Sequence, residues 1–129
     1  MPSVPYKQFS PHSFQFLPSA VYTTTQTSAD IGTSPFRGVE VVLDFTVEDA
    51  TVSLVVTIDG KDETSNKWST ILTGAAITAV GTNRYRIYPG ITAAANLDVS
   101  APLPPKIRIV VTPLDADEAT YSVGFSLLP

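Results

Sequence analysis

The fold is decided by one stretch, RGVEVVLDFTVEDATVSLVVTIDG, residues 37–60. Apolar side chains recur at every second position in two runs, one on either side of its centre. A period of two places one row of side chains on a core and the other toward water, so both runs are predicted β-strands. The apolar rows are Val39, Val41, Leu43, Phe45 and Val47 in the first run, and Val52, Leu54, Val56 and Ile58 in the second.

The two runs are predicted to pair as a β-hairpin. Glu48, Asp49 and Ala50 lie between them, where acidic turn formers are expected and β-branched residues are not. Because residues in the middle of a strand lie farthest from its ends, the core predicted from this stretch includes four of them: Leu43, Phe45, Leu54 and Val56.

Extended runs separated by turn signals also lie outside this stretch. Gly and Pro mark the turns, as at Gly32 to Pro35, Asp59-Gly60 and Pro89-Gly90. The further predicted strands are 20–27, 68–73, 75–80, 84–88, 106–114 and 119–128, with Asp115 to Glu118 as a hairpin loop between the last two. Residues 91–97 fit either a single helical turn or an irregular connection. With about seven to nine short strands and no amphipathic helix, the chain is predicted to be all-β, a single antiparallel β-sandwich or jelly-roll-like domain.

Composition limits the chain to a few classes. Its 129 residues suit one domain, and its apolar residues, 43% of the chain and rich in Val, Ile and Tyr, suit a pleated surface. The absence of Cys excludes a disulfide scaffold and a zinc site of the Cys type. A net charge of −4 disfavours nucleic acid as a direct partner. Neither a secretory signal nor an apolar run of about 20 residues is visible, so we expect no membrane partner and synthesis in the cytoplasm.

Residues 1–18 are predicted to form an extended N-terminal arm, with the β-sandwich domain at 19–129. Four prolines disfavour a helix and interrupt a sheet ladder: Pro2, Pro5, Pro11 and Pro18. Four aromatic residues need burial that an arm cannot give itself, and they are the predicted subunit or capsid interaction residues: Tyr6, Phe9, Phe14 and Phe16. The arm could fold back over its own domain or lie on a neighbouring subunit, and the sequence leaves both alternatives open.

No motif points to catalysis, a metal or a cofactor. His12 is the sole histidine, and no nucleophile-elbow pattern accompanies it. Two acidic groupings lack the spacing of a calcium loop: Asp59, Asp62 and Glu63, and Asp115, Asp117 and Glu118. Paired carboxylates for glycoside cleavage stay open, because their pairing is spatial. We therefore expect that the protein is not an enzyme and has no catalytic, cofactor-binding or metal-binding residues.

Several phrases in the second half of the sequence resemble those of a known group of proteins. They are Ile58 to Asp62, Lys67 to Leu72, Tyr85 to Gly90, Leu103 to Ile109 and Tyr121 to Leu128. Their order is similar to that in small β-sandwich virion structural proteins of tailed bacteriophages, and the similarity runs from about Val21 to the C-terminus. Members of such groups are head decoration or cement proteins, head fibres or tail components.

This resemblance implies a capsid decoration or cement protein and no catalytic residues. Such a protein would bind the major capsid protein or other virion proteins through its sandwich surfaces and its arm, as a homo-oligomer at the capsid surface. A tail or head-fibre subunit is the alternative. From a different class, a carbohydrate-binding β-sandwich module would use exposed aromatic residues. Trp68, Tyr85 and Tyr88 could form such a platform, although an aromatic residue in an alternating strand is more often part of a core.

Three apolar residues lie on rows predicted to face outward: Val42, Val55 and Val110. Single exposed valines are common and carry little weight. Three of them lead to the hypothesis that part of the outer face is covered by the arm, by a second subunit or by the capsid shell.

Overall fold

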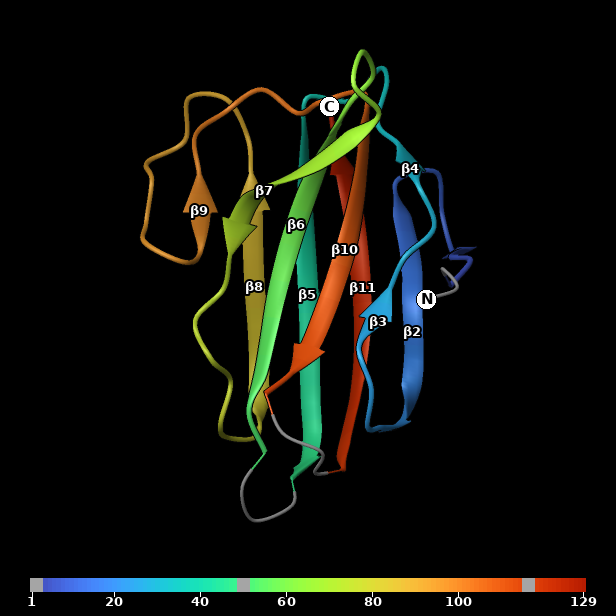
Figure 1. Ribbon diagram of the computed structural model, residues 1–129, viewed down its shortest axis with the longest axis vertical. Helices are drawn as coiled ribbons and strands as arrows, with labels where there is room; N and C mark the ends of the chain where they lie inside the picture. The colour runs from blue at the N-terminus through green and yellow to red at the C-terminus, as the bar shows by residue number, and fades with distance from the viewer. Residues whose placement is uncertain (1–3, 49–51, 115–117) are drawn as a thin grey trace.

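The computed structural model describes residues 4–48, 52–114 and 118–129 (Figure 1). These residues form eleven β-strands in two sheets, so the all-β class is confirmed. The strands are β1 (Lys7–Gln8), β2 (Ser13–Tyr22), β3 (Gln26–Thr27), β4 (Ile31–Gly32), β5 (Gly38–Glu48), β6 (Leu54–Asp62), β7 (Lys67–Thr73), β8 (Gly81–Ile87), β9 (Asp98–Val99), β10 (Lys106–Pro113) and β11 (Ala119–Leu128). Within the described ranges, no helix is long and apolar enough to cross a membrane.

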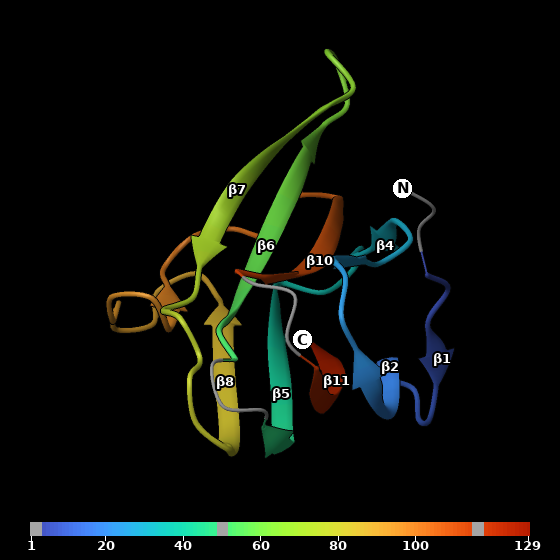
Figure 2. The same cartoon turned by 60° about the horizontal axis from the view of Figure 1, so that its bottom comes forward.

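The two sheets stack face to face as a β-sandwich with jelly-roll topology (Figures 1 and 2). The first sheet has the order β1-β2-β11-β5-β8-β9, and the second has the order β3-β10-β6-β7, with β4 also paired to β10. If β3 and β4 are counted as one strand and the short β9 is left aside, the chain changes sheet between successive strands from β2 to β11, except where β6 leads to β7. Two interlocked Greek keys of this kind define the jelly roll.

The predicted hairpin between the two runs of residues 37–60 is wrong. β5 pairs with β11 and β8 in the first sheet, whereas β6 pairs with β10 and β7 in the second. The same correction applies to β10 and β11, which also belong to different sheets. Alternation shows that a strand has one buried face, but it does not show which strand shares its hydrogen bonds. Asp49, Ala50, Asp115 and Asp117 of the predicted loops lie outside the described residues.

The core is formed by the apolar rows of both sheets, which face each other across the sandwich. The burial predicted for Leu43, Phe45, Leu54 and Val56 is confirmed, because each is at most 2% exposed. Val47 is the exception in its row and is 60% exposed. The register between β5 and β11 shifts so that Thr46 is an extra residue, and this bulge turns Val47 outward.

Bulges and irregular segments account for the other differences from the predicted strands. Residues 75–80 form no strand, and only Ile77 makes a single bridge, to Leu54. Gly81 to Asn83, which precede the predicted strand 84–88, already belong to β8. The segment 91–97 is an irregular connection in which Ala94 bridges to Asp98. In β7, a register shift makes Ile71 an extra residue, so Ile71 and Leu72 both pack toward the core while Trp68 lies on the outer face.

We expect Leu54→Ala to lower the free energy of unfolding by about 2–5 kcal/mol, because it removes apolar contacts and leaves a cavity between the sheets. Leu54 is 2% exposed, whereas Val47 is 60% exposed and serves as the matched control. Val47→Ala should change stability by less than about 0.5 kcal/mol. Chemical denaturation measures both, and equal losses would contradict this assignment of the strand faces.

Tyr121 allows a second stability test, because its buried hydroxyl has no hydrogen-bond partner among the described residues. Leaving such a group unpaired costs about 1–3 kcal/mol, so Tyr121→Phe should be neutral or raise stability by about 1 kcal/mol. Burial also raises the pKa of Tyr121 above its ordinary value of 10.0, and the nearby Tyr22 adds to this shift. The unfolded chain therefore releases this proton first, and the stability linked to Tyr121 falls as pH rises above 10. In denaturation at increasing pH, the variant should lose less stability than the parent, and a clear loss at pH 7 would contradict an unpartnered hydroxyl.

Candidate functional site

The N-terminal segment closes one open edge of the sandwich (Figures 1 and 2). The amide of Val4 donates to the carbonyl of Thr27 at 2.8 Å, and the amide of Ala29 donates to the carbonyl of Val4 at 2.8 Å, which ties the segment to the second sheet. A few residues later, β1 pairs with β2 in the first sheet. The ring of Tyr6 lies edge-on to Phe125, with the centroids 5.5 Å apart. Residues 4–8 therefore join the two sheets along this edge.

Three of the four predicted arm aromatics pack against their own domain. Phe16 is 1% exposed and belongs to the core, while Tyr6 and Phe14 are half-buried against it. Phe9 is 62% exposed and is the only one of the four with a mainly free ring. In the structure, Tyr6, Phe14 and Phe16 therefore follow the alternative in which the arm folds back over its own domain. A contact of Phe9 with another subunit stays a prediction.

The boundary between arm and sandwich at residue 18 needs correction, because β2 begins at Ser13. Proline was expected to interrupt a strand here, but β2 tolerates Pro18 where its register with β11 shifts, between Leu17 and Ala20. A second shift, beside Phe16, allows both Phe16 and Leu17 to be buried although they are adjacent in the chain. Sequence alternation alone does not reveal either bulge.

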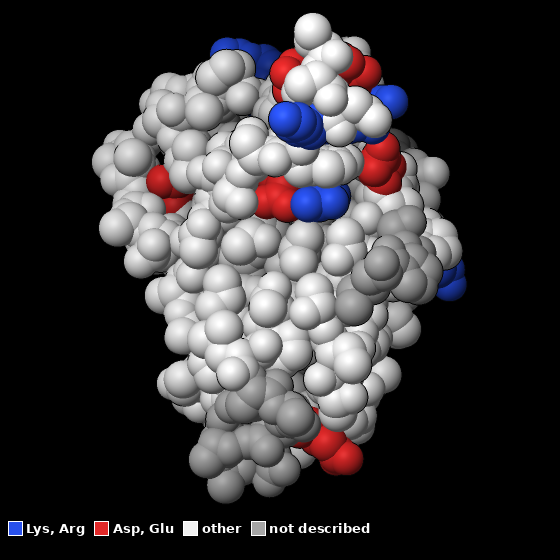
Figure 3. Space-filling model, in the orientation of Figure 1, with Lys and Arg blue, Asp and Glu red and all other residues white. Residues whose placement is uncertain are grey.

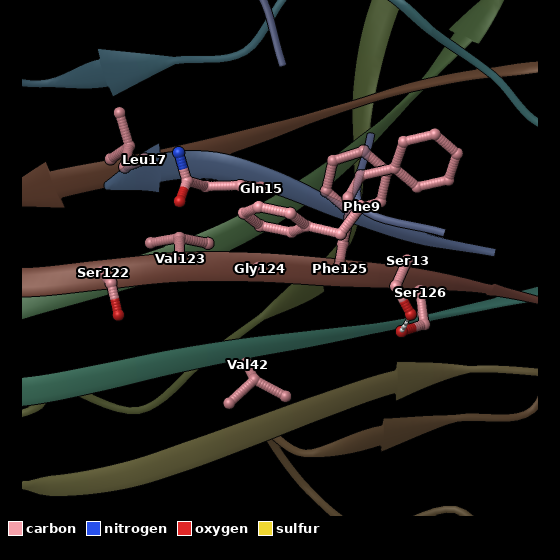
Figure 4. Close-up of a pocket in the computed structure, with 11 residues that line it drawn as sticks. Phe9, Ser13, Gln15, Leu17, Val42, Ser122, Val123, Gly124, Phe125 and Ser126 are labelled. Atoms are coloured by element: carbon pink, nitrogen blue, oxygen red, sulfur yellow. Dashed lines mark hydrogen bonds between the residues drawn. The ribbon is translucent and has the colours of Figure 1, made fainter. Parts of the chain in front are cut away.

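A shallow hollow of about 300 Å³ lies on the first sheet around Gly124 (Figure 4). Gly124 pairs with Gln15 of β2 on one side and with Val42 of β5 on the other, and it has no side chain to fill the space between them. The hydroxyls of Ser13 and Ser126 approach each other to 3.4 Å at one end. The residues that line the hollow carry no charge: Phe9, Ser13, Phe14, Gln15, Leu17, Val42, Ser122, Val123, Gly124, Phe125 and Ser126. The small outward residues of β11 (Ser122, Gly124 and Ser126) are the sequence signal that could have revealed it.

The second sheet carries a charged cluster on its outer face, in the region where Figure 3 shows Lys, Arg, Asp and Glu side chains gathered. Asp59 is 6% exposed and accepts hydrogen bonds from Nε of Arg108 at 2.9 Å and from Oγ1 of Thr70 at 3.0 Å. The guanidinium of Arg108 lies 4.6 Å from the ring centroid of Trp68. The cluster therefore links β6, β7 and β10 by contacts among its own members, which indicates a structural role. Its partners are distant in sequence, so no local motif could have predicted it.

The predicted acidic groupings do not form a metal site in the described part of the chain, where no three His, Cys, Asp or Glu residues lie together. Asp62 caps the turn between β6 and β7, and its pKa lies below the ordinary value because Ser65 and then Thr64 donate hydrogen bonds to its carboxylate. Glu63 faces Lys106 at 3.9 Å. Glu118 is exposed, and the other two acids of its grouping lie outside the described residues.

The remaining candidate residues from the sequence do not come together. His12 is exposed and its ring lies edge-on to Phe36, with the centroids 5.1 Å apart. Tyr85 is 2% exposed in the core of the first sheet, and the Tyr88 hydroxyl donates to the carbonyl of Pro129 at 2.7 Å. Trp68 belongs to the second sheet. The sugar-stacking platform suggested for Trp68, Tyr85 and Tyr88 is therefore not formed.

Comparison with known proteins adds little to this picture. No protein-family model and no curated protein matches the chain. Among solved structures, a chain in the structure of infectious bursal disease virus Gx strain is similar, with a TM-score of 0.47 and 11% identity over 90% of this chain. The matched region is 31% of that chain's length. A likeness at this level does not indicate a shared function, and the jelly-roll assignment rests on the strand order itself.

We expect Phe16→Ala to lower the free energy of unfolding by about 3–5 kcal/mol, because Phe16 is part of the core rather than of a free arm. Val21 in the same strand is 54% exposed, so Val21→Ala should have an effect below about 0.5 kcal/mol. Thermal or chemical denaturation distinguishes the two. If Phe16→Ala left stability unchanged, residues 13–18 would belong to an independent arm.

Replacing Arg108 by Met should destabilise the protein by about 1–3 kcal/mol, because Asp59 would keep its buried charge without a cationic partner. The control is Arg84→Met, which breaks the exposed pair with Glu40 at 3.0 Å and should cost less than about 1 kcal/mol. Loss of the stacked guanidinium should also shift the fluorescence of Trp68, the only tryptophan. Equal stability losses and an unchanged emission spectrum would show that the cluster contributes nothing specific.

Proposed function

We propose that the protein is a structural component of a virion, and that within this class it is a capsid decoration or cement protein of a tailed bacteriophage. It binds the major capsid protein or other virion proteins and acts as a homo-oligomer. After synthesis in the host cytoplasm it is located on the capsid surface. It performs no catalysis.

The observation that carries this proposal is the jelly-roll order of the long strands. Viral capsid domains use this architecture, and so do lectins and cupins, so the fold narrows the classes without selecting one. The bacteriophage assignment is supported by the sequence phrases between Ile58 and Leu128 that resemble virion structural proteins. Among the described residues, the polar side chains around Asp59 are paired with one another and no group of residues suited to catalysis lies together. This favours a structural role over an enzyme.

The outer faces of both sheets support a role in assembly. Val42 lies on the first sheet, Val55 and Val110 lie on the second, and all three are half-buried. Among the described residues, the N-terminal segment lies along the β2 and β3 edge rather than over the second sheet's outer face (Figure 2). Of the covers hypothesised for that face, a second subunit or the capsid shell is therefore the one proposed.

The direct test is to purify particles from cells that carry the gene, separate heads from tails and quantify the protein by mass spectrometry. A constant ratio to the major capsid protein in the head fraction is the expected result. Recovery with tails or head fibres alone would favour the alternative structural role. Absence from particles together with retardation on a polysaccharide gel would contradict the proposal and favour a carbohydrate-binding module.

A further inference from the structure

Phe9 is an exposed aromatic residue held in a defined position. Its amide donates to the carbonyl of Ser13 at 2.8 Å, which fixes the turn between β1 and β2. The ammonium of Lys7 lies 5.4 Å from the ring centroid, and the ring is still 62% exposed. A large apolar side chain on an anchored turn loses little conformational entropy when a partner covers it. Phe9 therefore has the properties of an interface anchor.

The hollow around Gly124 lies directly beside this anchor, since Phe9 is one of the residues that line it. Its volume of about 300 Å³ exceeds that of an apolar cavity of about 150 Å³ known to hold benzene, so a phenyl ring fits. Its lining is uncharged. The exposed ring of Phe9, called the knob below, and a hollow of suitable size thus lie on the same surface of one chain.

We infer that two copies of this chain associate about a twofold axis, with Phe9 of each copy inserted into the Gly124 hollow of the other. A twofold contact requires one patch to be complementary to itself, and a knob beside a hollow meets this condition. The inference rests on the proposed homo-oligomer and deepens it by naming the surface through which the copies meet.

The charges around the patch fit this arrangement. The chain carries a net charge of −4, so a contact through its acidic regions would bring like charges together. Lys7 flanks the knob. On the outward row of β5 at the far side of the hollow, Glu40 is already paired with Arg84 of β8 at 3.0 Å, whereas Asp44 accepts a hydrogen bond from Thr82 and makes no ion pair among the described residues. When the knob of one copy enters the hollow of the other, Lys7 of the first copy comes closer to Asp44 of the second. Complementarity of this kind favours a second copy in this orientation.

Sedimentation velocity of the full chain and of three variants tests the inference. Phe9→Ala removes the knob, and Gly124→Val fills the hollow with a residue that suits a strand. A Cβ at Gly124 would meet its nearest atom, the Phe14 carbonyl oxygen, at 3.4 Å, so the sheet can accommodate it with a small adjustment. Both variants should weaken dimerisation by about tenfold or more, as expected for an interface anchor. Leu97→Ala alters an exposed apolar residue before β9 and should leave dimerisation unchanged.

Mixing the two variants separates a lost contact from a folding defect. Each variant alone loses both knob-in-hollow contacts. A heterodimer of Phe9→Ala with Gly124→Val keeps one, because the Phe9 ring of the Gly124→Val chain meets a hollow in which Gly124 is unchanged, although that hollow lacks its own Phe9. The mixture should therefore associate more strongly than either variant alone. If Gly124→Val proves less stable than the parent in denaturation, Ser122→Leu fills the same hollow and replaces it.

Three results would overturn the inference. They are a parent chain that stays monomeric at about 100 µM, a Phe9→Ala variant that dimerises like the parent, and a mixture that associates no better than its components. A monomer that is retarded on a polysaccharide gel would assign the hollow to a sugar instead. Self-association is measured without any capsid shell. If it fails while the protein still binds heads, only this inference is lost, and if dimers form but heads are not bound, the proposed function is lost.

Discussion

The structure depends on the packing of apolar rows across the sandwich, between strands that share no hydrogen bonds. β5 and β6 are consecutive in the chain, yet they lie in different sheets and meet only through their inward side chains. The chain has no disulfide to supplement this contact. Each fully buried Val, Leu, Ile or Phe contributes about 1.5–3 kcal/mol, so this core is the main source of stability. Every other feature is positioned by the two sheets that the core holds together.

The edges of the two sheets explain the arrangement of the chain ends and the loops. An open edge exposes unpaired backbone groups and invites unwanted pairing. On one side, residues 4–8 connect the β2 edge to the β3 edge, and Tyr6 packs edge-on against both Phe14 and Phe125, which stack on each other. On the other side, β9 pairs in parallel with β8 and approaches β7. The N-terminal aromatic residues were predicted to contact a neighbouring subunit. Tyr6 and Phe14 instead pack at this closed edge and Phe16 lies in the core, whereas Phe9 remains exposed.

Most of the long strands and their buried faces could be predicted from the sequence, but the partners of these strands could not. Rows such as Leu43 with Phe45 and Leu54 with Val56 predicted both the class and the buried faces, because a period of two depends only on local backbone geometry. The pairing of β5 with β11 joins residues about 80 positions apart, and no local pattern carries that information. Bulges at Thr46, Phe16 and Ile71 change the face of a side chain without a sequence signal. The candidate site could not be predicted for the same reason. Phe9 remains exposed while Tyr6, Phe14 and Phe16 pack against their own domain, and local sequence does not show which of the four does which.

The most direct test of this account is whether β5 pairs with β11 and β8 rather than with β6, measured by nuclear Overhauser effects between backbone protons in solution. The account predicts cross-strand contacts of Val42 with Gly124 and with Arg84, which are its register partners on either side. Only side-chain contacts should connect β5 to β6. Backbone contacts that join β5 directly to β6 as an antiparallel pair would contradict the jelly roll and restore the simple hairpin.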